Sequence, residues 1–263
     1  MRTQQKNLGN IPESFWEELK TSPQKILLLD YDGTLAPFKI QRMQAHPLPG
    51  IIPILKRLSQ KKDHTIAIIS GRKIEELKIF LKNLPVILIG EHGWVIWEPI
   101  RGTKIPQKAK KIRKYLQDLK EKLETKIPEQ RIELKNFSLA VHTRGLRKER
   151  AEQIKKFALQ QAKELPAELF AINPFKKGVE IFARGMDKGK AAQKFLSRYK
   201  KPYFVVYLGD DLTDENAFQM LQNKGYGIKV GKPEKFTYAK FYLPNCQSVL
   251  KFLKRWEKVV NSS

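Results

Sequence analysis

Two aspartates at positions i and i+2, at the end of an apolar run, are the residues best suited to chemistry in this sequence. Apolar residues 26–29 lead into Asp30 and Asp32, and Gly33 and Thr34 follow. Alternate residues of a strand project to the same side, so both carboxylates can face one site just beyond a strand. Gly33 permits a sharp turn that brings backbone N–H groups close to an anion, and Thr34 adds a hydroxyl donor. The set suits a cation and a phosphate group together, with an ordinary polar turn as the alternative.

Ser70 and Gly71 stand at the end of a second apolar run, residues 64–69, and directly before a helical pattern. The first N–H groups of a helix are free and its dipole is positive there, so a hydroxyl at this place suits a phosphate oxygen. The alternative is that Ser70 only caps the helix.

Two further segments carry charged side chains that match the same chemistry. Lys188 opens a helix, and its ammonium group can bind phosphoryl oxygens. A third apolar run, residues 203–208, is followed by three carboxylates: Asp210, Asp211 and Asp214. Mg²⁺ prefers oxygen ligands such as carboxylates, and a carboxylate can also act as a nucleophile or as an acid and base. The combination predicts magnesium-dependent chemistry on a phosphate group.

The elements that must position these residues alternate between strand-like and helix-like patterns. Short buried runs separated by amphipathic helices predict a doubly wound, mostly parallel α/β sheet. Ligands of such sheets bind at the carboxyl ends of the strands, which is where the polar residues lie. Residues 94–97 are expected to return as an antiparallel strand, and residues 36–49, with three prolines, to form a loop or flap near the site.

The pattern changes between residues 104 and 182. Its order of helix, two strands, helix and two strands predicts a separate small α+β layer with an antiparallel sheet. The sequence therefore predicts an inserted α+β cap domain, residues 104–182, within a core domain formed by residues 1–103 and 183–263.

The composition is that of a globular chain with an unusual excess of positive charge. The 263 residues are 41% hydrophobic, and the formal net charge is +24. The basic residues are scattered along helices and mixed with Glu, which favours a lysine-rich surface or a pocket for anionic substrates over nucleic-acid binding. No apolar run is long enough for a transmembrane helix, and the N-terminus lacks the apolar core of a signal peptide. With a single cysteine, Cys246, a cytoplasmic location away from membranes is the simplest expectation.

The motifs, taken in order, resemble those of the haloacid dehalogenase superfamily of phosphohydrolases. DYDGT is similar to its first motif, IIS to its second, Lys188 to its third and GDDLTD to its fourth, and the place of the insertion resembles a C2-type cap. Within the superfamily, residues 25–260 most resemble the trehalose-6-phosphate phosphatase family. This closer likeness rests on LLLDYDGTLAPF, ISGR, GEHG, VHTR, KKGVEIFARGMDKGKA and LGDDLTDENAF.

The resemblance implies a role for each residue of the core site. Asp30 would attack phosphorus and form an aspartyl-phosphate, and Asp32 would protonate the departing sugar oxygen and then activate water. Mg²⁺ would lie between the Asp30 carboxylate, the Asp32 backbone carbonyl and Asp210. The remaining assignments are Asp211 and Asp214 to the metal shell, and Thr34, Ser70, Gly71 and Lys188 to the phosphate.

The resemblance also implies where the sugar binds. Arg144, Lys176 and Glu180 of the expected cap match positions that face the sugar in the family. After the Lys–Glu spacing the family has an Arg-Pro pair, which residues 183–184 of this chain, Ala-Arg, replace.

Glu91 and His92 of GEHG are further candidates for the substrate pocket, and a tight turn is the alternative. A sugar rich in hydroxyl groups needs hydrogen-bonding partners, because a buried polar group without one is unfavourable.

The leading hypothesis is a Mg²⁺-dependent phosphatase that hydrolyses a small-molecule sugar phosphate, trehalose 6-phosphate, in trehalose biosynthesis. A related phosphatase acting on mannosyl-3-phosphoglycerate or sucrose 6-phosphate is the nearest alternative. A phosphomutase is less favoured because nothing marks a site for a bisphosphorylated intermediate. A basic nucleic-acid-binding protein is also less favoured, because carboxylates without a metal repel phosphates. The chain is too short to include a glycosyltransferase half, so we expect any trehalose-phosphate synthase to be a separate protein.

Overall fold

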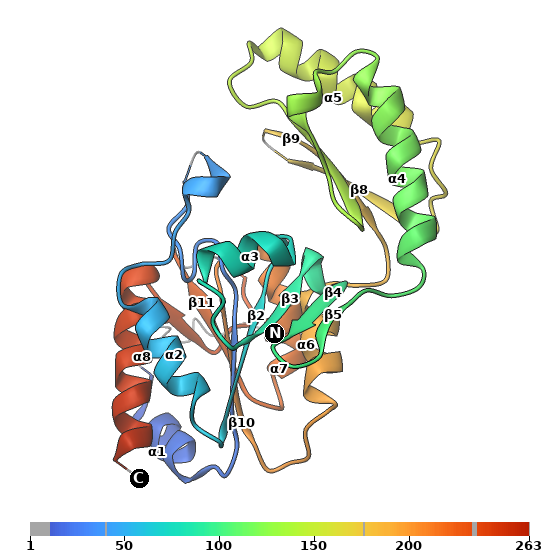
Figure 1. The fold of residues 1–263 in the computed structure, drawn as a ribbon. Helices are drawn as coiled ribbons and strands as arrows, with labels where there is room; N and C mark the ends of the chain where they lie inside the picture. Colours follow the sequence, from blue (N-terminus) through green and yellow to red (C-terminus); the bar gives the residue numbers. More distant parts are fainter. Residues whose placement is uncertain (1–10, 40, 176, 233–235, 263) are drawn as a thin grey trace, which may run out of the picture. The chain divides into compact units, whose positions relative to one another are not determined.

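The computed structural model describes residues 11–39, 41–175, 177–232 and 236–262 (Figure 1). The chain forms two compact units: Met1–Lys104 with Asp187–Ser263, and Ile105–Met186. The bounds expected for an inserted domain were 104–182. Arg184 falls in the second unit, where its Nε donates to the backbone carbonyls of Ala167 (2.9 Å) and Phe170 (2.8 Å). The side chain that replaces the family's proline therefore ties the last strand of this unit to the segment before it.

The first unit is built on one eight-stranded sheet with the order β12-β11-β10-β1-β2-β3-β4-β5. The six strands from β12 to β3 pair in parallel, and β4 and β5 add an antiparallel edge. The predicted mostly parallel α/β sheet is confirmed. The strands are β1 (Lys25–Leu29), β2 (His64–Ile69), β3 (Ile87–Gly90), β4 (Val95–Glu98), β5 (Gly102–Lys104), β10 (Phe204–Gly209), β11 (Tyr226–Val230) and β12 (Phe241–Leu243).

Strand β1 lies in the middle of this sheet, and all five of its residues are buried. It pairs in parallel with β2 on one side and β10 on the other, with Leu29 opposite both Ile68 and Leu208. A strand with neighbours on both sides and helices over both faces reads as a continuous apolar run. The residue after Leu29 therefore emerges between the carboxyl ends of β2 and β10.

Helices lie over both faces of the sheet (Figure 1). Helices α1 (Glu13–Thr21) and α2 (Ile51–Ser59) pack against α8 (Cys246–Asn261). Helices α6 (Lys188–Leu196) and α7 (Glu215–Leu221) pack against each other, and α3 (Ile74–Phe80) packs against β3 and β4. Each helix follows from an apolar stripe: α2, for example, buries residues at positions 51, 54, 55 and 58, the spacing of one helical face.

The second unit is a four-stranded antiparallel sheet, order β6-β7-β9-β8, with two helices packed on it. Its elements are α4 (Ala109–Glu124), η3 (Glu129–Arg131), β6 (Ile132–Leu134), β7 (Ser138–His142), α5 (Lys148–Ala162), β8 (Phe170–Phe175) and β9 (Gly178–Ala183). In β9, Val179 and Ile181 are buried while Glu180 between them is only half-buried. Because side chains alternate across a strand, Glu180 lies on the opposite face of the sheet from this core.

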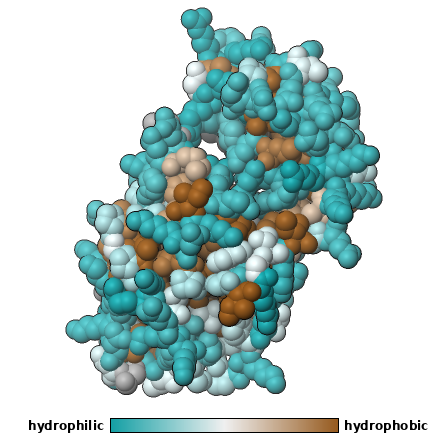
Figure 2. Space-filling model, in the orientation of Figure 1, coloured by the Kyte–Doolittle hydropathy of each residue, from teal (hydrophilic) through white to brown (hydrophobic). Residues whose placement is uncertain are grey.

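The short strand β5 was not expected from the sequence. Its residues, Gly-Thr-Lys, are half-buried or exposed and carry no apolar signal. Gly102 has φ +71°, a left-handed conformation that turns the chain back from β4 so that β5 can pair antiparallel with it. The visible surface is largely hydrophilic (Figure 2), as a chain with 30% charged residues requires.

His64, at the start of β2, is a buried histidine held in its neutral form. Trp256 Nε1 donates to His64 Nε2 (3.2 Å), so the ring proton is on Nδ1, which donates to Asp63 Oδ1 (2.8 Å). Burial lowers the pKa of His64 below its ordinary value of 6.5, although Asp63 opposes this. A protonated ring would also direct a second N–H at the Trp256 donor.

We expect this histidine to make the protein less stable in mild acid. Its pKa is lower in the folded than in the unfolded chain, so its contribution is fully present above the unfolded pKa and is lost as pH falls toward the folded one. The free energy of unfolding should therefore decrease between about pH 7 and pH 5. Urea denaturation at several pH values measures it. His64→Gln should flatten this dependence, whereas His46→Gln, at an exposed site, should not; an equal slope in all three proteins would contradict the assignment.

Candidate active site

The polar residues predicted at strand ends do meet at one edge of the sheet. Asp30 follows β1, Ser70 follows β2 and Asp210 follows β10, and these three strands are adjacent and parallel. The Asp30 backbone N–H donates to the carbonyl of Leu208 (2.8 Å), which continues the ladder up to the first site residue. The chain runs from β1 to β2 on one side and from β10 to β11 on the other. The site thus lies at the point where the strand order reverses, as the fold class predicts.

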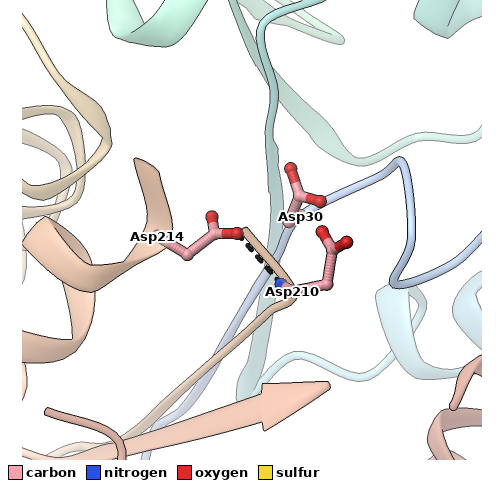
Figure 3. Close-up of side chains that lie close together, drawn as sticks. All are labelled: Asp30, Asp210 and Asp214. Atoms are coloured by element: carbon pink, nitrogen blue, oxygen red, sulfur yellow. Dashed lines mark hydrogen bonds between the residues drawn. The ribbon is translucent and has the colours of Figure 1, made fainter. Parts of the chain in front are cut away.

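Three carboxylates form the centre of the site. Asp30, Asp210 and Asp214 each offer an oxygen within 4.8 Å of the others (Figure 3). Gly33 makes this crowding possible, because a Cβ there would lie 2.0 Å from Asp210 Oδ2, and its φ of +79° also favours glycine. Gly209 does the same for Asp214, whose Cγ would be 2.3 Å from a Cβ at that position. The glycines of DYDGT and LGDDLTD therefore let carboxylates approach the backbone.

Lys188 is the buried cation that faces this group. Its Nζ donates to Asp30 Oδ1 (2.6 Å) and to Asp214 Oδ1 (2.7 Å), and its side chain is buried with both carboxylates. The two aspartates raise the pKa of Lys188 above its ordinary range, outweighing burial, which acts in the opposite direction. The helix begins at this residue, with Asp187 as its N-cap accepting from the Lys190 backbone N–H. The cap therefore fixes where the lysine leaves the helix.

Asp214 already has all its hydrogen bonds within the protein. Its Oδ1 accepts from Lys188 and from the Tyr207 hydroxyl (2.6 Å), and its Oδ2 accepts from the backbone N–H groups of Asp210 (3.0 Å) and Asp211 (2.9 Å). An ionised carboxylate has about four acceptor positions, and these four hydrogen bonds use all of them. The structure therefore shows Asp214 holding the loop after β10, and the sequence did not indicate the contribution of Tyr207, which sits inside an apolar run.

Asp211 lies outside the carboxylate group. Its side chain is exposed, and its Oδ1 accepts from the backbone N–H of Leu212 (2.7 Å) at the start of the short helix η4 (Leu212–Asp214). The metal assignment made for Asp211 from the sequence gains no support from this position, because its carboxylate serves as a local cap.

Burial and mutual repulsion disfavour the ionised forms of the central carboxylates. Burial, together with Asp214, raises the pKa of Asp30 to about 7 despite the opposing charge of Lys188. Burial, then Asp30 and Asp214, raise the pKa of Asp210 to about 9. One lysine does not neutralise three neighbouring carboxylates, so the group is suited to a further cation.

Three buried side-chain atoms at the site lack hydrogen-bond partners among the described residues. They are Asp210 Oδ1, Thr34 Oγ1 and Arg72 Nη1. A buried polar atom without a hydrogen bond is unfavourable. The first is a carboxylate oxygen, suited to a hard divalent cation, and the second is a hydroxyl, suited to a phosphate oxygen. The residues present therefore fit both groups that the sequence predicted.

Asp32 does not join the carboxylate group but pairs with Arg72. Arg72 Nε donates to Asp32 Oδ2 (2.6 Å), and its Nη2 donates to Asp32 Oδ1 (2.5 Å). The arginine belongs to the ISGR segment, and sequence reasoning did not assign it a role. The spacing of 40 residues carries no local signal for such a pair.

Ser70, for which the sequence suggested either phosphate binding or helix capping, does not cap helix α3. The helix begins at Ile74, its N-cap is Lys73, and Ser70 Oγ accepts from the Arg72 backbone N–H (3.2 Å). The capping alternative is therefore wrong. Ser70 is buried beside the central strand end, which leaves the phosphate-binding role as a proposal.

Glu91 and His92 lie directly against this same segment. Both have left-handed backbones, φ 50° and 58°, which non-glycine residues rarely adopt. The Glu91 N–H donates to the Arg72 carbonyl and the His92 N–H to the Ser70 carbonyl, and a Cβ on Gly71 would lie 2.6 Å from the His92 ring. Gly71 is therefore small because the imidazole packs on it. GEHG is a tight turn, as one reading had it, and it also places a histidine beside the site.

The sugar-binding candidates of the second unit lie within its sheet and directly beside it. Glu180 pairs across the sheet with Ala140, and Arg144, which is exposed, follows β7 at the side of the β8–β9 turn. The Thr143 N–H donates to the Lys177 carbonyl (2.8 Å), which joins these two turns. Lys176 lies outside the described residues.

The comparisons with known proteins decide the family. A family profile described as Trehalose-phosphatase matches residues 28–247. The chain belongs to the trehalose-phosphatase family. It is 31% identical over 233 residues to the bifunctional trehalose-6-phosphate synthase/phosphatase of Thermoproteus tenax, covering 88% of this chain and 32% of that protein. It is 30% identical to trehalose-phosphate phosphatase B of Arabidopsis thaliana, covering 88% of this chain and 66% of that protein.

The fold of this family member also matches solved structures. The structure of the C. albicans trehalose-6-phosphate phosphatase C-terminal domain aligns with a TM-score of 0.78 at 24% identity, covering 97% of this chain and 99% of that one. At this identity the match supports the fold. Of the helices that the structure describes, none combines the length and the apolar character needed to cross a membrane.

Proposed function

We propose that this member of the trehalose-phosphatase family is a Mg²⁺-dependent phosphatase that hydrolyses trehalose 6-phosphate to trehalose and phosphate. The observation that carries the proposal is Asp30, a buried carboxylate at the end of the central strand, ion-paired with Lys188 and crowded by two further aspartates. Family membership supports the substrate.

The reaction proceeds in two steps on this chain's own groups. An Asp30 carboxylate oxygen attacks phosphorus, the bond from phosphorus to the sugar oxygen breaks, and that oxygen takes its proton from Asp32. A water molecule then attacks phosphorus, gives a proton back to Asp32, and the bond from phosphorus to Asp30 breaks. Phosphate leaves, and both carboxyl groups return to their starting states.

Asp30 and Asp210 are the residues that would hold a magnesium ion. Asp210 Oδ1 is a buried acceptor without a partner among the described residues, whereas the oxygens of Asp214 are already used. Asp214 therefore orients the loop that carries Asp210. When bound, Mg²⁺ offsets the negative charge of the phosphoryl group during its transfer.

The phosphate group binds to hydroxyl, backbone and ammonium donors around Asp30. Thr34 contributes its unpartnered buried hydroxyl, Lys188 contributes its ammonium group, and Ser70 and Gly71 contribute donors at the end of β2. Donors aimed at the oxygens of the phosphoryl group stabilise the charge that these oxygens carry in the transition state.

The second unit acts as the cap that recognises the sugar. Glu180 and Arg144 offer an acceptor and donors for sugar hydroxyls, and Glu180 lies on the sheet face that the helices leave open. Glu91 and His92 are proposed as substrate-binding residues of the first unit. Mannosyl-3-phosphoglycerate and sucrose 6-phosphate stay as alternative substrates, since this kind of recognition suits any polyhydroxylated ligand.

A trehalose-phosphate synthase is the expected partner. The relative from Thermoproteus tenax is named as a bifunctional synthase/phosphatase, and this chain spans 32% of its length. The synthase is therefore proposed as a functional partner, and the single cysteine suits a reducing cytoplasm.

A substrate panel tests the proposal. We expect phosphate release from trehalose 6-phosphate in the presence of Mg²⁺, much faster than from sucrose 6-phosphate or mannosyl-3-phosphoglycerate, and loss of release when a chelator removes the metal. Returning Mg²⁺ should restore the rate, because the carboxylate group then recovers its counter-charge. A preference for another sugar phosphate would identify that compound as the substrate in place of trehalose 6-phosphate. Full activity in chelator would overturn the role of the metal.

A further inference from the structure

Arg72 forms an ion pair with Asp32 through two hydrogen bonds. Its guanidinium grips both oxygens of Asp32 in a two-pronged arrangement, at 2.5 and 2.6 Å. Such paired, charge-assisted bonds fix orientation as well as distance. The side chain of Arg72 is 2% exposed, whereas that of Asp32 is 30% exposed. Asp32 is therefore open to reactants on one side, and Arg72 is not.

The arginine is itself held on several sides. Its Cζ lies 5.1 Å from the centre of the Tyr31 ring and 4.8 Å from that of Phe80, so the guanidinium packs on two aromatic faces. Its Nη2 also donates to the carbonyl of Arg42 (3.0 Å), and its own carbonyl accepts from Glu91. A side chain with this many restraints has little freedom to move, so it can impose a position on its partner.

We propose that Arg72 is a positioning residue that sets where the Asp32 carboxyl group stands when the leaving oxygen departs. The inference rests on the role proposed above for Asp32. In that step an Asp30 oxygen bonds to phosphorus, the phosphorus–oxygen bond to the leaving group breaks with its electron pair staying on the oxygen, and the proton passes from Asp32 to that oxygen. The two-pronged pair is that of the ionised carboxylate; when Asp32 carries the proton, one of its oxygens keeps the bond to Arg72 and the other holds the proton. Proton transfer needs the carboxyl group within hydrogen-bond reach of this oxygen. Arg72 fixes the position of the Asp32 carboxyl group from which the proton is transferred to the leaving oxygen.

A purely structural role for Arg72 predicts something different. The residue also contacts the loop of residues 36–49 through the Arg42 carbonyl, and loosening that loop would slow every substrate alike. Loss of proton delivery, in contrast, slows substrates according to how much their leaving group needs a proton. Leaving-group dependence therefore separates the two roles.

The test compares Arg72→Gln with the unchanged enzyme on a series of aryl phosphates, from 2,4-dinitrophenyl to phenyl phosphate, with Mg²⁺. We expect kcat/KM for phenyl phosphate to fall roughly 100-fold, and for 2,4-dinitrophenyl phosphate by less than about tenfold, because a good leaving group needs no acid. In an Asp32→Asn background, Arg72→Gln should add no further leaving-group dependence. Equal losses across the series, or the same added dependence without Asp32, would overturn the inference.

Two further variants keep the test decisive. Arg72→Lys retains the charge but not the two-pronged geometry, so it should show the same dependence if the Gln variant does not fold. Arg42→Gln removes the ion pair that joins the same loop to Glu76 of α3 (2.5 Å) and should leave the dependence unchanged. Failure on trehalose 6-phosphate with activity on aryl phosphates would refute the proposed substrate alone, whereas inactivity on every ester would refute both proposals.

Discussion

Asp30→Asn is expected to abolish phosphate release and to reduce kcat by at least about 10⁴-fold, because the change removes the nucleophile. An amide cannot form the aspartyl-phosphate, and no other described carboxylate stands at the end of β1 with a lysine donating to it. The fold should persist, because Lys188 keeps its ion pair with Asp214 (2.7 Å) and one of three crowded carboxylates becomes neutral. Phosphate release from trehalose 6-phosphate and thermal denaturation measure the two effects.

The matched control for this prediction is Asp118→Asn. Asp118 is exposed on α4, and the same change there should leave the rate unaltered. In addition, acid quenching of the unchanged enzyme during turnover should yield a phosphorylated peptide that contains residue 30. Substantial activity in Asp30→Asn, or a phosphorylated peptide from elsewhere, would exclude the proposed nucleophile.

Lys188→Met is expected to remove activity and also to destabilise the fold. The change leaves Asp30 and Asp214 buried without their shared cation, and breaking a buried ion pair in this way lowers the free energy of unfolding by about 3–5 kcal/mol. Activity is lost because the phosphate loses its ammonium donor. Urea denaturation in chelator measures the stability, since a bound cation would otherwise compensate for part of the missing charge.

A second variant separates the two consequences of losing Lys188. In Lys188→Met with Asp214→Asn, an amide oxygen can still accept from the backbone N–H groups of residues 210 and 211, and the amide nitrogen can donate to the Tyr207 hydroxyl. This double variant should regain part of the stability without regaining activity. An unchanged stability in Lys188→Met alone would show that the buried lysine does not balance the carboxylates.

Most helices and strands of this fold could be predicted from the sequence, because the residue patterns that indicate them are local. The run YFVVYL predicted a buried strand over residues 203–208, and β10 covers Phe204–Gly209. The apolar positions of the last helix predicted residues 247–260, and α8 covers Cys246–Asn261. Burial of one face imposes a period on the chain, and that period is visible without coordinates. The polar strand β5 has no such period and was missed.

The chemistry-bearing residues at the strand ends were also predictable. Parallel strands bring their carboxyl ends to one edge, so Asp30, Ser70 and Asp210 were expected at that edge once the sheet was inferred. The strand order that makes β10, β1 and β2 adjacent came from the structure. Their types indicated a phosphate ester and a divalent cation. The motif order indicated the family, which the matches over residues 28–247 confirm.

Tertiary structure alone decided how these similar carboxylates differ. Asp210 and Asp214 belong to one motif, yet one has a buried oxygen without a partner among the described residues and the other is saturated by Lys188, Tyr207 and two backbone N–H groups. Asp32 and Asp30 lie two residues apart, yet one pairs with Arg72 and the other with Lys188. A sequence specifies which side chains are available at an edge. The partners of Asp32 and Asp30 lie 40 and 158 positions away, and only the folded chain brings them into contact.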